Sequence, residues 1–346
     1  MTNNENPINN QCLLVESATV PSGSDTERGE TKRSLVSLPL EPLKRDNVRI
    51  EVAWSSLNYK DALCASGHPG VARTLPIVPG IDAAGRVVES NCDKLATGQS
   101  VTVFHAEFGT ASHGGYRQFI EVPSDWVYPI PDSISPRQAM IIGTAGFTAA
   151  QCVDELQKHS IEPDDGEVVV SGATGGVGIF AVMLLAKLGY RVVASTGKPE
   201  RSSWLKSLGA TEVIGREELN DTSERTLLKG RWAGAVDTVG GNTLATILRS
   251  TNAHGCVTAC GLVGGTDFSI SVYPFIIRGV TLQGIDTALI SREYRAGLWQ
   301  RLGSDWKLDN LDELATEVSL GGLEEKIEMI LNGKVAGRVV VKLADN

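Results

Sequence analysis

Ser171-Gly172-Ala173-Thr174-Gly175-Gly176-Val177-Gly178 is the stretch that decides the fold of this 346-residue chain. It follows the buried-strand pattern Glu167–Val170 and leads into an apolar, helix-like run, Val177–Leu188. A dinucleotide pyrophosphate can approach such a turn only where side chains are missing, as at Gly175 and Gly176, and the helix N-terminus then offers free N–H groups. Gly178 allows the helix to pack closely on the strand. The strand–turn–helix context therefore predicts a Rossmann-type unit.

Strand-like and helix-like runs alternate on both sides of this turn. A helix is expected over Gln138–Ala150, and further helices over Ser202–Leu208 and Leu244–Arg249. The expected strands after the turn are Tyr190–Ser195, Glu212–Ile214, Gly234–Val239, Gly255–Gly261 and Val280–Gly284. A βαβ series of this kind predicts an α/β fold with a doubly wound parallel sheet.

The part of the chain before this series has a different texture. Alternating runs predict strands at Cys12–Val15, Leu35–Leu38, Val48–Trp54, Arg86–Ser90 and Val101–Phe104. Residues 1–11 are rich in Asn and predict a disordered tail, and the polar stretch Pro21–Arg33 predicts an enlarged surface loop. The last residues add a helix around Trp299, another at Leu323–Leu331 and a strand at Arg338–Lys342. We therefore expect a β-rich domain over 12–142 and 289–346, around a nucleotide-binding domain over 143–288.

Composition excludes several classes of protein. The net charge is −9 and the isoelectric point about 5.2, with no basic stripe, which argues against nucleic-acid binding. No run approaches a membrane span, and the start lacks the features of a secretory signal. The six cysteines are scattered without a C-x-x-C pair, which favours reduced thiols. The sequence thus predicts a cytoplasmic protein that binds neither membranes nor nucleic acid.

The end of the second strand indicates which dinucleotide is bound. An NAD site carries an acidic residue about 20 positions after the glycine motif, where it binds the ribose 2′-hydroxyl. Here the strand ends Ser195-Thr196-Gly197-Lys198, without an acid. Hydroxyls and a cation suit a 2′-phosphate, and Arg216 follows the next strand as a second cation. NADPH is the expected cofactor.

The order of parts resembles the medium-chain dehydrogenase/reductase superfamily, and so implies a GroES-like substrate domain around the Rossmann domain. Zinc-dependent members carry a catalytic Cys and a Gly-His-Glu motif. The corresponding stretches here place Asn58 and Ile81 where those Cys and His ligands would stand. The histidines show no ligand spacing, and only His113 remains a candidate pocket residue. The chain is therefore expected to be independent of zinc.

Specific runs resemble one branch of this superfamily, the acryloyl-CoA reductases. The runs are Trp54–Ala62, Ile77–Gly85, Ala139–Thr148, Trp232–Gly240 and Ala259–Leu262. The resemblance implies NADPH-dependent reduction of the C=C bond of acryloyl-CoA to propionyl-CoA, by a homodimer. It also implies a set of cofactor contacts: Tyr59, Thr174, Gly175, Gly176, Val177, Thr196, Gly197, Lys198, Arg216, Leu262, Ile276, Thr287 and Arg338.

The implied reaction places charge and a proton at defined atoms. Hydride goes to the β-carbon of the thioester, the thioester oxygen becomes enolate-like and needs donors, and the α-carbon receives a proton. Tyr59 is the candidate catalytic residue, with packing on the cofactor as the equal alternative. Lys60 and Asp61 are expected to form a local ion pair, and Asp82 to be structural.

Two other functions remain open on the sequence. A quinone or general enone reductase would share the fold and the NADPH site, and a non-catalytic NADPH-binding redox sensor would share them without turnover. No run identifies a surface for CoA. Three arginines are candidate partners for the CoA phosphates, and each is equally well interpreted as a solvated charge: Arg73, Arg292 and Arg295.

Overall fold

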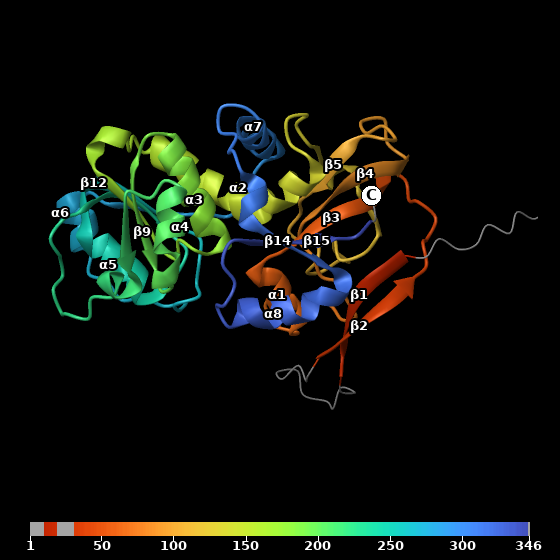
Figure 1. Cartoon of the computed structure of the whole chain (residues 1–346), viewed down its shortest axis with the longest axis horizontal. Helices are drawn as coiled ribbons and strands as arrows, with labels where there is room; N and C mark the ends of the chain where they lie inside the picture. Colours follow the sequence, from red (N-terminus) through yellow and green to blue (C-terminus); the bar gives the residue numbers. More distant parts are fainter. Residues whose placement is uncertain (1–9, 19–30, 345–346) are drawn as a thin grey trace, which may run out of the picture. The chain divides into compact units, whose positions relative to one another are not determined.

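A six-stranded parallel sheet forms from the strand–helix alternation that surrounds the glycine turn (Figure 1). In this computed structural model, which describes residues 10–18 and 31–344, its order is β10-β9-β8-β11-β12-β13. This is the Rossmann order, in which the first strand, β8, lies beside the fourth, β11. The strands are β8 (Glu167–Val170), β9 (Arg191–Thr196), β10 (Glu212–Gly215), β11 (Trp232–Asp237), β12 (Thr251–Ala259) and β13 (Thr281–Gly284). The predicted doubly wound sheet is confirmed.

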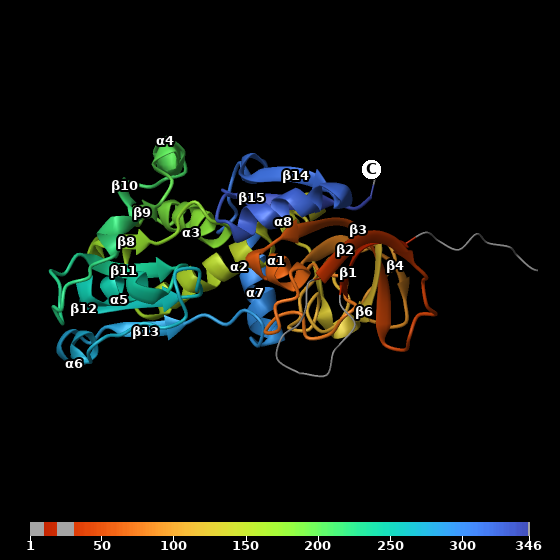
Figure 2. The same cartoon turned by 90° about the horizontal axis from the view of Figure 1, so that it is seen from below.

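Helices cover both faces of this sheet. The crossovers after β8 and after β11 run in opposite directions along the sheet, so their right-handedness puts α3 and α5 on opposite faces (Figure 2). Helix α3 is buried over nearly its whole length, which explains why its sequence is apolar on all sides. The helices here are α3 (Gly176–Lys187), α4 (Ser202–Ser207), α5 (Gly241–Ser250), α6 (Tyr273–Arg278) and α7 (Arg292–Leu302).

A second, mainly antiparallel sheet is built from the two ends of the chain. Its order is β14-β15-β3-β4-β5-β7, and β6 also pairs with β3, while β1 and β2 form a separate hairpin. The strands are β1 (Asn10–Ser17), β2 (Thr31–Leu38), β3 (Asn47–Leu57), β4 (Ala83–Ser90), β5 (Ser100–Val103), β6 (Phe119–Pro123), β7 (Val127–Pro129), β14 (Ala315–Ser319) and β15 (Arg338–Lys342). Helices α1 (Tyr59–Ala65) and α8 (Leu323–Leu331) pack against each other beside it.

The described residues divide into two compact units, residues up to Thr144 with those from Asn310 onward, and Ala145–Asp309. Helix α2 (Pro136–Lys158) contains the first boundary next to an interruption at Gly143, where φ is 48°. Residues 289–309 lie in the second unit, whereas the sequence assigned them to the substrate domain. The reason is that α7 is anchored on the second half of α2.

Helix α7 is held to α2 by charge and by an aromatic contact. The Asp154 carboxylate accepts a hydrogen bond from the Tyr294 hydroxyl at 2.7 Å and pairs with Arg301 at 2.7 Å. The buried Trp299 ring lies 6.2 Å from that of Phe147. These contacts fall within the second unit and explain where its last helix belongs.

Both polar segments predicted near the N-terminus fall partly outside the described residues. Residues 1–9 of the predicted tail and 21–30 of the predicted loop are not described. Of the rest, Asn10 and Gln11 are not a tail, because they begin β1, and Thr31–Arg33 begin β2. The Asn10 side chain explains the first difference, since it donates to the backbone oxygen of Phe119 and accepts from its N–H.

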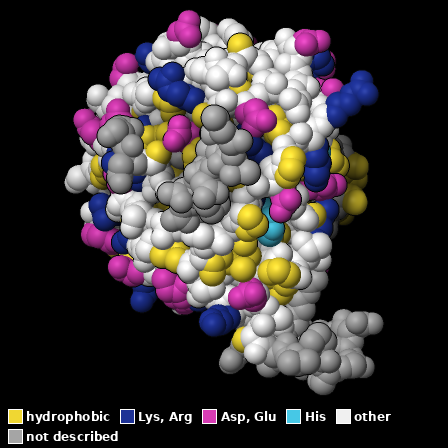
Figure 3. Space-filling view, turned by 90° about the vertical axis from the view of Figure 1, so that its right-hand side faces the viewer, with side chains coloured by type: hydrophobic (Ala, Val, Ile, Leu, Met, Phe, Trp, Pro, Cys, Tyr) yellow, Lys and Arg dark blue, Asp and Glu magenta, His cyan; other side chains and the backbone are white. Residues whose placement is uncertain are grey.

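The face of the first unit in Figure 3 mixes cationic and anionic side chains, with apolar ones scattered between them. It therefore presents no surface of a single charge. Within 10–18 and 31–344, no helix is both long enough and apolar enough to cross a membrane. All six cysteines are free thiols, and four of them are buried.

Candidate functional site

The glycine turn is tight because its backbone folds back on itself. Gly172 has φ +58°, and α3 begins at Gly176 with Gly175 as its N-cap. A Cβ on Gly175 would lie 3.2 Å from the Gly172 oxygen, and one on Gly178 would collide with the same oxygen. The turn therefore leaves the N–H groups of the first turn of α3 uncovered by side chains, as an anionic phosphate requires.

A buried carboxylate that sequence reasoning missed holds this turn in place. Asp237, at the end of β11, accepts a hydrogen bond from the Ser171 hydroxyl at 2.6 Å and from the Gly240 N–H at 2.8 Å. Burial raises the pKa of Asp237, and these hydrogen bonds oppose the shift. A signal was present in the sequence, because Asp237 is an acid within the predicted strand Gly234–Val239, which neighbours β8 in the Rossmann order.

Three of the predicted 2′-phosphate residues lie together at the end of β9. The Thr196 hydroxyl accepts a hydrogen bond from the Lys198 N–H at 3.0 Å and lies 3.2 Å from the hydroxyl of Thr174. A Cβ on Gly197 would lie 3.3 Å from Nε of Arg216, so the guanidinium rests against this turn. Burial lowers the pKa of the Lys198 ammonium. Two hydroxyls and the Arg216 guanidinium thus lie at the turn that contains Lys198.

Leu262, Ile276 and Thr287 have different surroundings within the second unit. Leu262 follows β12 beside the turn at Gly240, where its Cα lies 3.2 Å from the position of a Gly240 Cβ. Ile276 lies on α6 with 70% of its surface exposed. The Thr287 hydroxyl lies 2.9 Å from that of Thr148 and donates to Gln151. The sequence did not single out Thr148 or Gln151 as contacts of Thr287.

Tyr59 and Arg338 belong to the first unit. Tyr59 is the first residue of α1, a helix that the sequence analysis did not predict, and its ring is half-buried. The signal for α1 was an Asn N-cap at position 58 with an acid three residues later. Arg338 is 3% exposed, so its guanidinium lies inside the protein, where it donates to the Asn58 amide oxygen at 3.2 Å and to the Ser56 hydroxyl at 3.0 Å.

Asn58 is the centre of a buried polar cluster, which we call the Asn58 cluster and define as Ser56, Asn58, Asp61, Asp82, Thr144 and Arg338. Its amide nitrogen donates to Asp61 at 3.1 Å and to Asp82 at 2.8 Å. Asp82 also accepts from the Ser56 hydroxyl and the Thr144 hydroxyl, each at 2.6 Å. Burial and the neighbouring Asp82 carboxylate raise the pKa of Asp61 to about 7.

By the resemblance to the superfamily, Asn58 of this cluster and the nearby Ile81 correspond to the zinc ligands of zinc-dependent members. Asn58 and Ile81 supply neither thiolate nor imidazole there, and in the described part of the chain no three His, Cys, Asp or Glu side chains are arranged to hold a metal ion. The predicted ion pair of Lys60 with Asp61 is wrong, because Lys60 is exposed while the Asp61 carboxylate is fully buried against N–H donors. Asp82, for which a structural role was predicted, is fully buried and accepts hydrogen bonds from Ser56, Asn58 and Thr144.

Two further candidates have roles inside the fold. The His113 ring accepts a hydrogen bond from the Val78 N–H at 3.0 Å, and burial lowers its pKa. Arg295 is 3% exposed, donates to the Thr287 carbonyl and lies over the Phe147 ring, so it is not a surface partner for phosphate. Arg73 and Arg292 are exposed.

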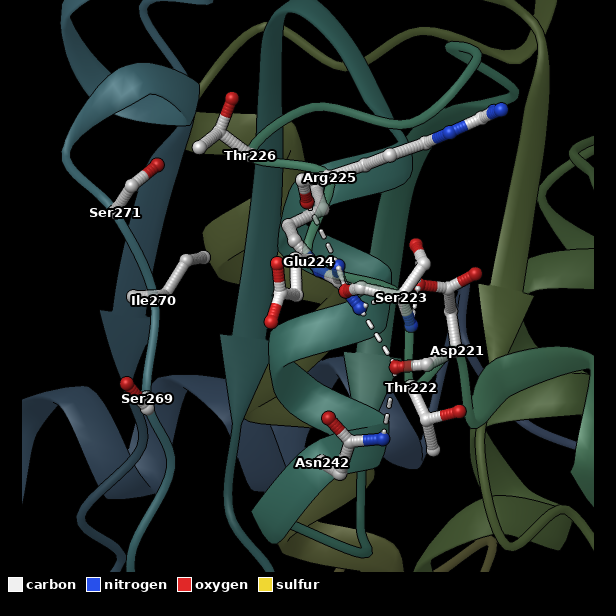
Figure 4. A pocket seen from close by; sticks show the side chains of 11 residues that line it. Asp221, Thr222, Ser223, Glu224, Arg225, Thr226, Asn242, Ser269, Ile270 and Ser271 are labelled. Atoms are coloured by element: carbon white, nitrogen blue, oxygen red, sulfur yellow. Dashed lines mark hydrogen bonds and ion pairs between the residues drawn. The ribbon is translucent and has the colours of Figure 1, made fainter.

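A polar pocket in the second unit lies between residues 221–226 and 269–271 (Figure 4). The Arg249 guanidinium beneath it donates to the carbonyl oxygens of Asp221, Ser223 and Arg225. This arginine therefore holds the loop, and its charge is already engaged. Arg225 points away from the pocket in Figure 4. We assign no ligand to it.

Two family models match the chain, "Alcohol dehydrogenase GroES-like domain" over residues 44–132 and "Zinc-binding dehydrogenase" over 176–304. The acrylyl-CoA reductase AcuI of Ruegeria pomeroyi is 42% identical over 317 residues, which cover 92% of this chain and 96% of the relative. The Bacillus subtilis protein YhfP, which bears a quinone oxidoreductase name, is 45% identical over 308 residues, or 89% and 93% of the two chains. The chain belongs to the AcuI branch of the quinone oxidoreductase-like medium-chain dehydrogenases/reductases.

Solved structures of this branch agree with the fold. The YhdH oxidoreductase of Salmonella enterica, in complex with NADP, has a TM-score of 0.89 at 42% identity and covers 96% of this chain and 100% of its own. The structure of YhfP with NAD bound has a TM-score of 0.90 at 42% identity, covering 96% and 99%. The family and the GroES-like and Rossmann architecture predicted from the sequence are confirmed. As a member of this branch, the chain is an oxidoreductase.

The raised pKa of Asp61 predicts a pH-dependent stability. The pKa is about 7 in the folded chain, against about 4 when unfolded, so the stabilisation by the bound proton is complete below about pH 4 and is lost as the pH rises to about 7. Over that window the free energy of unfolding of the wild type should fall by up to about 1.4 kcal/mol per pH unit relative to that of Asp61→Asn, because the Asn side chain has no proton to release. Urea unfolding at several pH values measures the difference.

The matched control is Asp132→Asn, which removes an exposed carboxylate. Its stability should follow the wild type throughout the window. If Asp61→Asn and wild type changed in parallel between pH 4 and 7, Asp61 would not titrate there.

Proposed function

We propose that the chain is an NADPH-dependent reductase of the C=C bond of acryloyl-CoA, with propionyl-CoA as product. The choice of NADPH as cofactor rests on one observation: Arg216 lies against the turn that contains Lys198, at the end of β9, where an NAD site would carry an acid. The substrate is supported by the acrylyl-CoA reductase name of a relative that matches 92% of this chain.

The residues present fit NADPH. The turn at Gly172, Gly175 and Gly178 has no room for side chains and would hold the pyrophosphate on α3, with Thr174, Gly176 and Val177 in the same turn. Thr196, Gly197, Lys198 and Arg216 would hold the 2′-phosphate. By resemblance to the family, we propose five further cofactor contacts: Tyr59, Leu262, Ile276, Thr287 and Arg338. When bound, NADPH supplies the hydride that the β-carbon of the thioester receives.

This chain would supply the protein side of the reaction through Tyr59. Among the residues that the structure describes, the Tyr59 hydroxyl has no hydrogen-bond partner, so it can donate to a bound substrate. One role is to stabilise the charge that develops on the thioester oxygen, and another is to deliver the proton to the α-carbon. Packing on the cofactor is the alternative to both. Asn58 and Ile81 offer neither thiolate nor imidazole to zinc, so the proposed reaction uses no zinc.

A quinone or general enone reductase is the second candidate, favoured by the name of YhfP. It would use the same cofactor residues. The non-catalytic NADPH-binding redox sensor left open by the sequence is not proposed, because the chain belongs to a branch of oxidoreductases. We also propose a cytoplasmic location, which the six free thiols support.

The homodimer is a proposal supported by an exposed apolar surface. Val272, Ile276 and Ile277, on and before α6, are 62–70% exposed. They lie in the segment that leads into β13, which is the edge strand of the parallel sheet. An edge strand beside apolar side chains is suited to pairing with a second copy.

For the cofactor we expect a preference for NADPH over NADH that depends on Arg216. Arg216→Ala should lower kcat/KM for NADPH about 10–100-fold, because a charged hydrogen bond contributes about 1.5–3 kcal/mol, and leave that for NADH nearly unchanged. The control is Arg191→Ala, which removes an exposed arginine at the opposite end of β9. Steady-state kinetics with both dinucleotides measure the effect, and equal efficiency with both would refute the assignment.

For the substrate we expect acryloyl-CoA to be reduced faster than crotonyl-CoA or a quinone. Tyr59→Phe should lower kcat by about 10²–10⁴ if the hydroxyl acts as an acid or donor. If Tyr59 only packs on the cofactor, its loss should weaken NADPH binding at near-normal turnover. Tyr128→Phe, in the same unit, is the control. A quinone rate above the acryloyl-CoA rate would select the second candidate.

For the oligomer we expect twice the chain mass of 36.8 kDa in light scattering after gel filtration. Ile277→Asp should shift the population toward monomer, because it places a charge on the apolar surface. Val88→Asp, on an exposed position of β4, is the control and should remain dimeric. A wild type that is monomeric at micromolar concentration would contradict the proposal.

A further inference from the structure

The backbone at the start of α1 determines where the Tyr59 ring can lie. Tyr59 is the first helical residue, and no hydrogen bond of its hydroxyl to a described residue fixes the side chain from its far end. The helix has only seven residues, Tyr59–Ala65, so it cannot hold its own first turn rigidly by length. Packing against α8 holds the helix as a whole, and contacts of the N-cap residue, Asn58, hold its first turn.

Asp61 makes those contacts. One of its carboxylate oxygens accepts from the Asn58 N–H at 2.8 Å and from the Asn58 amide nitrogen at 3.1 Å, while the Asp61 N–H donates to the Asn58 carbonyl at 3.0 Å. Backbone and side chain of the N-cap are thus both held by one residue three positions later. This is the capping-box arrangement, and here it is completely buried.

The second oxygen of Asp61 extends this hold beyond the helix. It accepts from the Ile81 N–H at 2.8 Å and so ties α1 to the segment before β4. The position of that segment is itself fixed, because Gly80 has φ +102° and a Cβ there would lie 2.8 Å from the Tyr116 N. Asp61 therefore holds Asn58, the residue before Tyr59, in place relative to Ile81.

A buried carboxylate is a costly way to satisfy N–H groups unless its charge or its number of acceptor sites is needed. The number of acceptor sites is used here, because Asp61 accepts three N–H bonds, two on one oxygen and one on the other. An Asn at this position would accept with one oxygen only and would turn its NH2 toward an N–H donor. The arrangement is therefore specific for Asp.

We propose that Asp61 is a positioning residue for Tyr59, acting through the Asn58 N-cap to hold the tyrosine in the orientation that the proposed reduction requires. This deepens the proposed function and rests on it for the role of Tyr59, but the positioning itself does not depend on any substrate. The groups that face Asp61 are Asp82, Tyr116, Arg338 and the Asn58 amide. Because burial and Asp82 raise the pKa of Asp61 to about 7, a change in its charge alters the hold near neutral pH.

Fluorine NMR of the chain labelled with 3-fluorotyrosine tests the positioning without substrate. The protein has six tyrosines, and the Tyr59 signal is the one that Tyr59→Phe removes. In the wild type this signal should shift with pH with a midpoint near 7. In Asp61→Asn it should be displaced and lose that step, whereas in Lys60→Gln, on the exposed side of the same turn, it should behave as in the wild type.

Asp61→Glu is the conservative variant, because Glu can make the same reciprocal bond to an N-cap. It should restore part of the wild-type position of the Tyr59 signal. The titration of the wild type needs no variant, so the proposal stays open to refutation even if Asp61→Asn does not fold. A Tyr59 signal that is insensitive to pH between about 5 and 8 and to both substitutions would overturn it.

Kinetics then separate positioning from a merely structural role. Asp61→Asn should lower kcat about 10–100-fold in the wild-type background and less than about twofold when added to Tyr59→Phe, because residues that act through one another are not additive. Equal losses in both backgrounds would refute action through Tyr59. If acryloyl-CoA is not turned over at all, the proposed function fails, while the NMR result still decides the positioning.

Discussion

Two carboxylates and one guanidinium are buried together around the amide of Asn58, and the first unit is organised by the need to satisfy them. Removing such charges from water is costly unless each is paired and hydrogen-bonded. Asn58 meets this need because an amide presents a donor and an acceptor in opposite directions, toward Asp61 and Asp82 on one side and toward Arg338 on the other. The end of β3, the start of α1 and the segment before β4 are joined by this one side chain.

The same constraint explains the interruption of α2. A Cβ on Gly143 would lie 2.6 Å from Asp82 and 2.9 Å from Arg338, so the chain passes the Asn58 cluster at a residue without a side chain. The Thr144 N–H, directly after it, donates to Asp82. In the second unit the Asp237 carboxylate holds the glycine turn through hydrogen bonds, as the Asp61 carboxylate holds the start of α1. In both units, buried carboxylates fix short backbone segments whose own hydrogen bonds are too few to do so.

Local pattern was sufficient where an element is long or strongly periodic. The sheet around the glycine turn, α8 and β15 were predicted from apolar runs alone, because packing in these elements follows the period of the sequence. Helix α1 was missed because it directly follows the strand β3 without a turn signal between them, although its N-cap signal was present. The assignment of α7 differed because its anchors, Asp154 and Phe147, lie far away in sequence.

The candidate site was predictable to the extent that it is local. The turn at Thr174–Val177 and the strand end at Thr196–Lys198 are contiguous, whereas the approach of Arg216 to Gly197 is a tertiary contact that the sequence only suggested. The burial of Arg338 could not be predicted, because its carboxylate neighbours, Asp61 on α1 and Asp82 before β4, are distant from it along the chain. The expected cofactor contacts of Tyr59 and Arg338 came from the resemblance to the family and not from the pattern of the sequence.

The Asn58 amide also shows where similarity of shape misleads. Aspartate has nearly the outline of asparagine, and the exchange is commonly regarded as mild. At this position it would replace an amide that donates to both Asp61 and Asp82 with a third acceptor, leaving three carboxylates around one guanidinium. Spontaneous deamidation of Asn58 would make the same change in an ageing molecule. Asn and Asp have nearly the same volume, so the exchange at this position is opposed by the loss of a hydrogen-bond donor and not by a change in size.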